Sequence, residues 1–175
     1  MIPSVDRHLE AIRERLAETI FPMLPPEAEF AREQASFVLM ALDLVRAAHP
    51  HAYRYEVVER HEYAAAVGDL LALGVSPGAE AEARDALAAP EPRADEASIP
   101  LAALIEGNRA LKTVVTRLFE ALCAEGGETA DSAREVLRRL AVRQVARERA
   151  LFASTGYTRS ETSLAETLAQ PGAAS

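Results

Sequence analysis

The chain has 175 residues, a length that fits one domain around one core. Hydrophobic residues make up 49% of it and aromatic residues only 5%, so we expect a folded protein with an aliphatic core. The formal net charge of -8 disfavours general binding to nucleic acid or to an anionic membrane surface. The single cysteine excludes an intramolecular disulfide and fits a reducing compartment. With no secretory signal or membrane span expected, we predict a cytoplasmic protein.

The spacing of apolar residues predicts helices along the first half of the chain. The first covers residues 4–20, capped by Ser4 and stopped by Pro22. The second covers 27–48 and is apolar most of the way round, which is typical of a central helix. Its main buried face is expected to consist of Phe30, Phe37, Val38, Ala41, Leu42 and Val45. A third helix over 52–73 and a short fourth over 76–89 follow, the latter capped by Ser76.

The second half predicts an exposed linker over 90–97 and two long helices, over 98–124 and 131–154, separated by Gly126-Gly127. Together these elements predict an all-α bundle of five to six mostly antiparallel helices. We expect a single helical-bundle domain over 1–156 and a flexible tail over 157–175. Within that tail, Leu164 and Leu168 allow one short helical stretch.

The helix over 98–124 has a coiled-coil-like apolar seam that contains one asparagine. Asn108 stands in line with leucines such as Leu104 and Leu111. A buried amide there must find hydrogen-bond partners or cost on the order of 1–3 kcal/mol. We interpret Asn108 first as a residue that specifies register or partner, and alternatively as a ligand contact or a partly exposed residue beside Gly107.

Histidines, tyrosines and glutamates cluster around the start of the third helix. At about 100° per residue, His51, Tyr55, Glu59 and Glu62 share one face of it. Such a face can bind a metal or act in acid–base chemistry. Neither His-Glu-x-x-His nor the Glu-x-x-His of di-iron bundles occurs in the sequence, so we expect a structural or solvated face and no metal site.

Arg32, Ser36 and Asp43 form the one polar strip on the helix over 27–48. If that helix is central, Arg32 and Asp43 must each have a partner elsewhere or face a cavity. A cavity lined by this strip and by Asn108 is our candidate small-molecule site. The alternative is that the strip is simply the solvent-exposed side of the helix.

Arginines line one edge of the helix over 131–154, at Arg139, Arg143 and Arg147. A basic helix can bind nucleic acid. Because the whole chain is acidic, we instead expect these arginines to pair with acidic helices of the same chain or of another subunit. No catalytic residue or cofactor can be assigned, and Cys123 is expected to be an inert buried thiol.

Three stretches carry a resemblance to a known family: Leu9-x-x-Ile12-x-x-x-Leu16 with Ile20-Phe21-Pro22-x-Leu24, then Phe30-Ala31-Arg32, and Leu104-x-x-x-Asn108-x-x-Leu111. In them the chain resembles an uncharacterised bacterial all-helical family encoded beside aminoglycoside-phosphotransferase-like and acyl-CoA dehydrogenase genes. The resemblance implies an accessory helical protein in small-molecule or acyl metabolism and identifies no catalytic residue.

The leading hypothesis from the sequence is a non-catalytic accessory or protein-interaction protein, either a homodimer or a subunit beside an enzyme. It depends on the asparagine-containing seam and on acidic and basic surfaces that can pair between chains. The alternative is a small-molecule binding protein or enzyme, with an acyl or CoA-type ligand in a pocket between helices.

Overall fold

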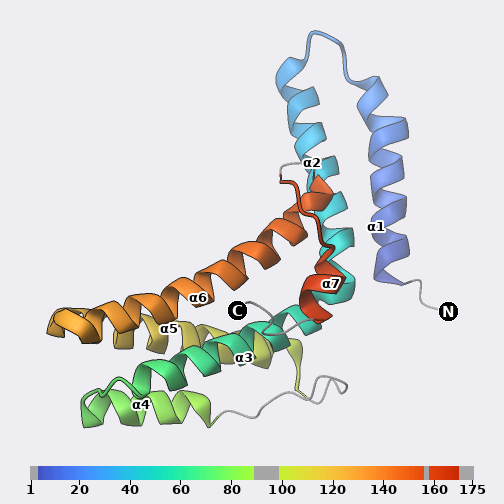
Figure 1. Cartoon of the computed structure of the whole chain (residues 1–175). Helices are drawn as coiled ribbons and strands as arrows, with labels where there is room; N and C mark the ends of the chain where they lie inside the picture. The colour runs from blue at the N-terminus through green and yellow to red at the C-terminus, as the bar shows by residue number, and fades with distance from the viewer. Residues whose placement is uncertain (1–3, 89–98, 156–157, 170–175) are drawn as a thin grey trace. The chain divides into compact units, whose positions relative to one another are not determined.

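The computed structural model describes residues 4–88, 99–155 and 158–169, and within these ranges it contains helices and no strand (Figure 1). The prediction of an all-α bundle is therefore confirmed. The expected linker over 90–97 lies outside the described residues. The chain divides into two compact units: unit 1 comprises Met1–Ala52 and Glu148–Leu164, and unit 2 comprises Tyr53–Arg147 and Ala165–Ser175. One domain over 1–156 stays a prediction, because compact units need not fold independently.

Unit 1 is built around a helical hairpin. Helix α1 (Val5–Glu14) is capped by the Ser4 hydroxyl, which accepts a hydrogen bond from the Arg7 backbone N–H, and α2 (Glu29–Ala48) runs back beside it (Figure 1). Between them lie a π-helical turn, η1 (Arg15–Ile20), and a 3-10 turn, η2 (Phe21–Met23). In the π turn the Phe21 N–H donates to the Leu16 carbonyl. That five-residue step keeps the half-buried Leu16 and Phe21 on the same side of the helix.

The prediction that the second helix is the central one is wrong. No residue of α2 is buried, and most of the side chains predicted as its buried face are exposed: Phe30 by 74%, Phe37 by 44%, Val38 by 50% and Val45 by 46%. The physical reason is that α2 packs on α1 with its polar strip, where ion pairs join the helices, and so turns its apolar side away from α1.

Unit 2 holds α3 (Ala52–Leu71, from Tyr53 on), α4 (Pro77–Leu87), α5 (Leu101–Glu125), most of α6 (Gly127–Phe152) and most of α7 (Leu164–Ala169). Ser76 caps α4 as predicted, and its hydroxyl accepts a hydrogen bond from the Ala79 N–H. Gly126 ends α5 with a φ of 74°, a conformation that favours glycine. Helix α6 begins directly afterwards, a few residues earlier than expected.

The core of the protein lies in unit 2, where α3, α4, α5 and α6 pack together. Its buried members are Ala66, Val67, Leu70, Ala83, Leu111, Val114, Val115, Leu118, Leu122, Ala133, Val136 and Leu140. The predicted seam of α5 is thus confirmed as buried, apart from Leu101 at its surface end. Because the seam packs inside unit 2, it does not supply the subunit interface that we expected from it. The short helix expected in the tail is α7, whose Leu168 is 1% exposed.

Candidate functional site

The seven predicted site residues fall into both units. Arg32, Asp43 and His51 belong to unit 1, and the other four, Tyr55, Glu59, Glu62 and Asn108, belong to unit 2. His51 is the last residue of a 3-10 turn, η3 (His49–His51), and is half-buried. The two groups are therefore considered in turn, each with the partners it has in its own unit.

Arg32 and Asp43 have partners on the α1 side of the hairpin. The Arg32 Nη1 donates to the Leu24 carbonyl at 3.0 Å, and its guanidinium lies 4.5 Å from the centre of the Phe21 ring. The Arg13 Nε donates to Asp43 Oδ1 at 2.5 Å, and this bond raises the pKa of Arg13. Each of the two residues has a partner outside α2, although that expectation assumed a central helix and α2 is not central. The polar strip of α2 is therefore the side on which α2 is joined to α1.

Asn108 is buried and bound to α3. Its Nδ2 donates to both the backbone carbonyl of Glu56, at 2.9 Å, and the Glu56 Oε2, at 2.8 Å. Both partners are acceptors, which fixes the amide nitrogen on this side and leaves the Oδ1 facing elsewhere. That Oδ1 is buried and has no hydrogen-bond partner. Asn108 therefore fixes the register of α5 against α3, and one atom of it remains available to another donor.

Glu59 lies one turn further along α3 and pairs with the only lysine of the chain. Its Oε2 is 2.8 Å from the Nζ of Lys112 on α5, and that ammonium also lies over the Tyr63 ring at 5.4 Å. Burial lowers the pKa of Lys112, but the hydrogen bond and charge of Glu59 outweigh it, so the net shift is upward. The Glu59 side chain is largely buried, whereas that of Lys112 is 42% exposed.

Glu62 forms the most deeply buried ion pair with α6. The Nη1 of Arg147 donates to Glu62 Oε2 at 2.5 Å, and the Nε of Arg143 lies 3.6 Å from the other carboxylate oxygen. The Arg147 guanidinium lies 5.0 Å from the centre of the Tyr55 ring, and the whole residue is only 1% exposed. Burial disfavours its charge, yet the hydrogen bond to Glu62 keeps the pKa of Arg147 above its ordinary value.

These contacts define the polar cluster of unit 2: Tyr55, Glu56, Glu59, Glu62, Asn108, Lys112, Arg143 and Arg147. The carboxylates and cations of the cluster are mostly paired with one another, so its first effect is to fix how α3, α5 and α6 align. Four atoms of the cluster are buried without a hydrogen-bond partner: Asn108 Oδ1, the Nε of Arg143, and the Nε and Nη2 of Arg147. One acceptor and three charged donors of this kind can bind water or a small anionic group.

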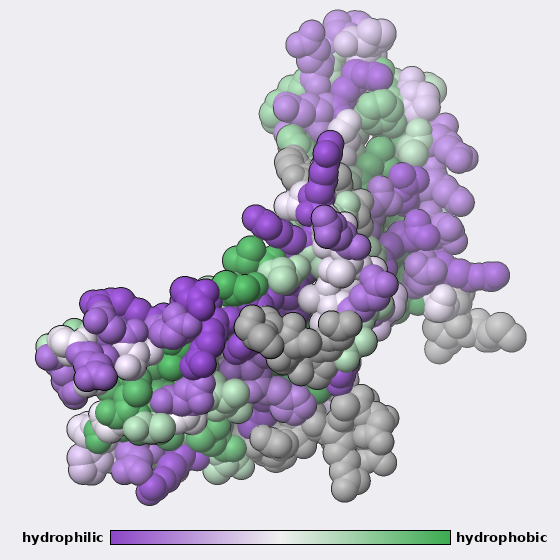
Figure 2. All heavy atoms as spheres, in the orientation of Figure 1, coloured by the Kyte–Doolittle hydropathy of each residue, from purple (hydrophilic) through white to green (hydrophobic). Residues whose placement is uncertain are grey.

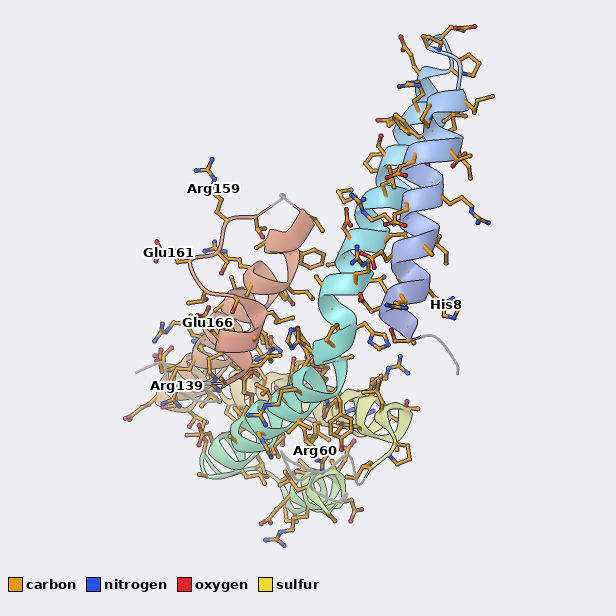
Figure 3. All side chains as sticks on the ribbon, turned by 90° about the vertical axis from the view of Figure 1, so that its right-hand side faces the viewer. His8, Arg60, Arg139, Arg159, Glu161 and Glu166 are labelled. Carbon is orange, nitrogen blue, oxygen red and sulfur yellow. The ribbon has the colours of Figure 1, made fainter. Side chains whose placement is uncertain are left out.

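Sequence reasoning placed Tyr55, Glu59 and Glu62 on one face correctly but assigned that face no partners. Lys112 and Arg147 were the missing members. The signal for Arg147 was present, because the arginine edge of α6 was expected to pair with acidic helices, and Arg139 indeed lies 3.3 Å from Asp69 on α3. Arg60, which is labelled in Figure 3, is a further buried charge on α3.

A second candidate site is the exposed apolar side of α2, which we call the α2 apolar face: Phe30, Gln34, Phe37, Val38, Ala41 and Val45. These residues recur every three or four positions and so lie along one side of the helix. In Figure 2, apolar side chains lie at the surface of the hairpin among the polar ones. Among the described residues of unit 1, α2 contacts α1 and the 3-10 turn η4 (Ala153–Thr155), and these six side chains stay exposed.

An open groove of about 510 Å³ lies at the α3–α6 end of unit 2. It is lined by Asp69, Ala72, Leu73, Glu128, Asp131, Ser132, Glu135, Val136 and Arg139. Most of its acids already have arginine partners, in ion pairs with Arg134, Arg138 and Arg139. The hydrogen bond from Arg138 lowers the pKa of Glu135. The groove therefore offers little unpaired charge to a ligand.

Within 4–88, 99–155 and 158–169, no group of three or more histidine, cysteine or acidic side chains is placed to hold a metal ion. Over the same ranges, no helix is both long and apolar enough to cross a bilayer. Finally, no family model, curated protein or solved structure matches this chain.

Proposed function

We propose that this chain is a non-catalytic protein-interaction protein of the cytoplasm that binds its partner through the α2 apolar face. The observation that carries the proposal is the exposure of that face, on which Phe30 is 74% exposed and three further large apolar residues are each exposed by 44% or more. Single exposed apolar residues are ordinary, but a row of them along one helix marks an interaction surface.

The stability of unit 1 supports the same proposal. Neither α1 nor α2 has a buried residue, and two helices without a buried seam gain little from each other. Their ion pairs are half-exposed, as in Arg13–Asp43, and such pairs contribute roughly 0–1 kcal/mol each. A partner helix on the α2 apolar face supplies the apolar burial that the hairpin lacks, in the manner of a helix bound in a groove.

Site-specific photo-crosslinking tests this function. A photoreactive residue in place of Val38 is compared with one in place of Val142 on α6, because the two valines are equally exposed, at 50% each. We expect a protein adduct of defined mass at Val38 in living cells and none at Val142. Equal adducts at both positions, or no protein adduct at Val38, would contradict the proposal.

A second candidate function is the binding of a small anionic molecule at the polar cluster of unit 2. The observation that favours it is the set of buried atoms without partners on Asn108 and Arg147. The family resemblance, which stays a prediction, suggests an acyl or CoA-type ligand. Thermal-shift measurements with carboxylates and acyl-CoA on the wild-type protein and on Asn108→Leu test it. A ligand that stabilises both proteins equally, or neither, rules the cluster out as its site.

A further inference from the structure

The guanidinium of Arg147 has one edge that none of the described residues uses. Its Nη1 donates to Glu62 Oε2 at 2.5 Å, whereas its Nε and Nη2 are buried and have no hydrogen-bond partner in the described part of the chain. Nε and Nη2 lie on the same side of the planar group, so their outer N–H bonds point in nearly the same direction. The two donors therefore form a fork that can hold two acceptor atoms at once.

The surroundings of Arg147 make this edge the place where a further acceptor can bind. The ring of Tyr55 lies against the guanidinium, with its centre 5.0 Å from the central carbon. The whole residue is only 1% exposed, so bulk water does not solvate the fork. A buried charged donor that lacks an acceptor is more costly than a neutral one. An acceptor with two oxygen atoms would remove that cost at both donors.

The charges next to Arg147 favour an acceptor that is itself negative. Glu62 is shared by two guanidinium groups, because the Nε of Arg143 lies 3.6 Å from its Oε1 and is also buried without a hydrogen bond. The remaining unpaired carboxylate of the cluster, Glu56, accepts from Asn108 on the α5 side. The α6 side of the cluster therefore has two positive charges for one negative charge.

A carboxylate matches this fork in both shape and charge. Its two oxygens lie in one plane and accept two parallel N–H bonds from one edge of a guanidinium. Its single negative charge equals the local excess of positive charge. A phosphate monoester would bring about 1.5 to 2 negative charges into the same place, at a larger desolvation cost.

From these observations we infer that the Nε–Nη2 edge of Arg147 binds the carboxylate of a small monocarboxylic acid. This inference rests on the second candidate function, anion binding at the polar cluster, and names the chemical class of the ligand. The ligand is a free acid and not a CoA thioester, because the acyl end of a thioester has no carboxylate. Arg143, whose side chain is 22% exposed, marks the side from which such an acid reaches Arg147.

The first test follows the Arg147 Nε–H directly by nuclear magnetic resonance on the wild-type protein. A buried N–H exchanges slowly with water, so its resonance can be observed and assigned through bonds. We expect straight-chain monocarboxylates from formate to hexanoate to shift this resonance in a saturable way. Acetamide has the shape of acetate without its charge, and it should not shift the resonance at the same concentrations. Equal shifts with acetate and acetamide would overturn the inference.

The second test compares two arginines of α6 by substitution. Arg147→Lys keeps the charge but removes the fork, and it should weaken carboxylate binding by roughly 10-fold or more. Arg139→Lys is the matched control, because Arg139 is half-exposed and pairs with Asp69 in the same way that a lysine can. It should leave the dissociation constant within a few-fold of wild type, and equal losses in the two variants would contradict the inference. If Arg147→Lys does not fold, the measurement on the wild-type protein still decides.

Further outcomes separate this inference from the candidate function on which it rests. If inorganic phosphate or CoA shifts the Arg147 Nε–H at lower concentration than every monocarboxylate, the cluster binds anions but the carboxylate assignment is wrong. A carboxylate that raises the melting temperature and leaves this resonance unchanged binds elsewhere, which overturns the inference alone. If no anion moves the resonance and none stabilises the protein, both the inference and the candidate function fail.

Discussion

The buried ion pair between Glu62 and Arg147 gives the sharpest prediction about stability. Arg147 is 1% exposed, and its acidic partner among the described residues is Glu62, at 2.5 Å. Glu62→Gln keeps the size of the side chain but leaves the guanidinium buried without a counter-charge, beside the like charge of Arg143. Breaking a buried pair on one side costs about 3–5 kcal/mol. For a chain of this length, that loss lowers the melting temperature by roughly 6–20 °C.

Two comparison variants make this prediction specific. Glu59→Gln should cost no more than about 1 kcal/mol, because water can solvate Lys112, whose side chain is 42% exposed. Glu62→Met combined with Arg147→Met removes both charges and should recover most of the loss.

The assay for all three variants is urea unfolding followed by circular dichroism, with hydrogen exchange at Val67 and Leu111 to isolate unit 2. The reasoning fails if Glu62→Gln costs no more than Glu59→Gln, or if the double variant is as unstable as Glu62→Gln alone.

Three further predictions concern single positions. The folded-state pKa of Lys112 is raised, so its pairing with Glu59 contributes stability below about pH 10.4 and loses it as the pH rises through the folded pKa. Unfolding free energies measured between neutral and strongly alkaline pH should therefore fall more steeply for wild type than for Lys112→Met, and parallel curves would contradict this. Gly68→Ala should stabilise the protein by about 0.5–1 kcal/mol, because nothing lies within 4 Å of the new Cβ. Gly107→Ala should gain nothing, because its Cβ meets the buried Arg60 Nη1 at 3.2 Å, and an equal gain in chemical denaturation would refute the clash.

The helices and the α5 seam could be predicted because their signals are local. Leu104, Leu111 and Leu118 recur at helical spacing, and a seam with few charges has to be buried somewhere in the fold. Caps such as Ser76 and the stop at Gly126 are equally local, since each depends on one residue and its own backbone.

What periodicity could not predict is which surface covers which. The residues on the apolar side of α2 were identified correctly, but their spacing does not show which element or which chain packs on them. That side was predicted to be buried in a central helix, whereas the ion pairs of Arg13 and Arg46 join α1 to the polar strip instead. The proposed partner would reconcile the two, because it buries the apolar side of α2.

The polar cluster of unit 2 was half-predicted for a similar reason. Glu59 and Glu62 share a face by simple helical geometry. Their partners Lys112 and Arg147 come from helices that lie roughly 50 to 85 residues further along the chain, and pairing them requires the register between helices. An isolated glutamate on a helix face therefore looks solvated in the sequence and is buried in the structure.

The π turn at Arg15–Ile20 has a consequence for how the hairpin can vary in length. It contains one residue more than an α-helical turn needs, so the loss of a single codon here would convert it to ordinary α-helix. Leu16 and the aromatic ring of Phe21 would then be four residues apart and would still lie on the same side. The loss of two codons would rotate the hairpin tip away from α2. This turn is thus a place where a one-residue deletion is tolerated without a change in helix pairing.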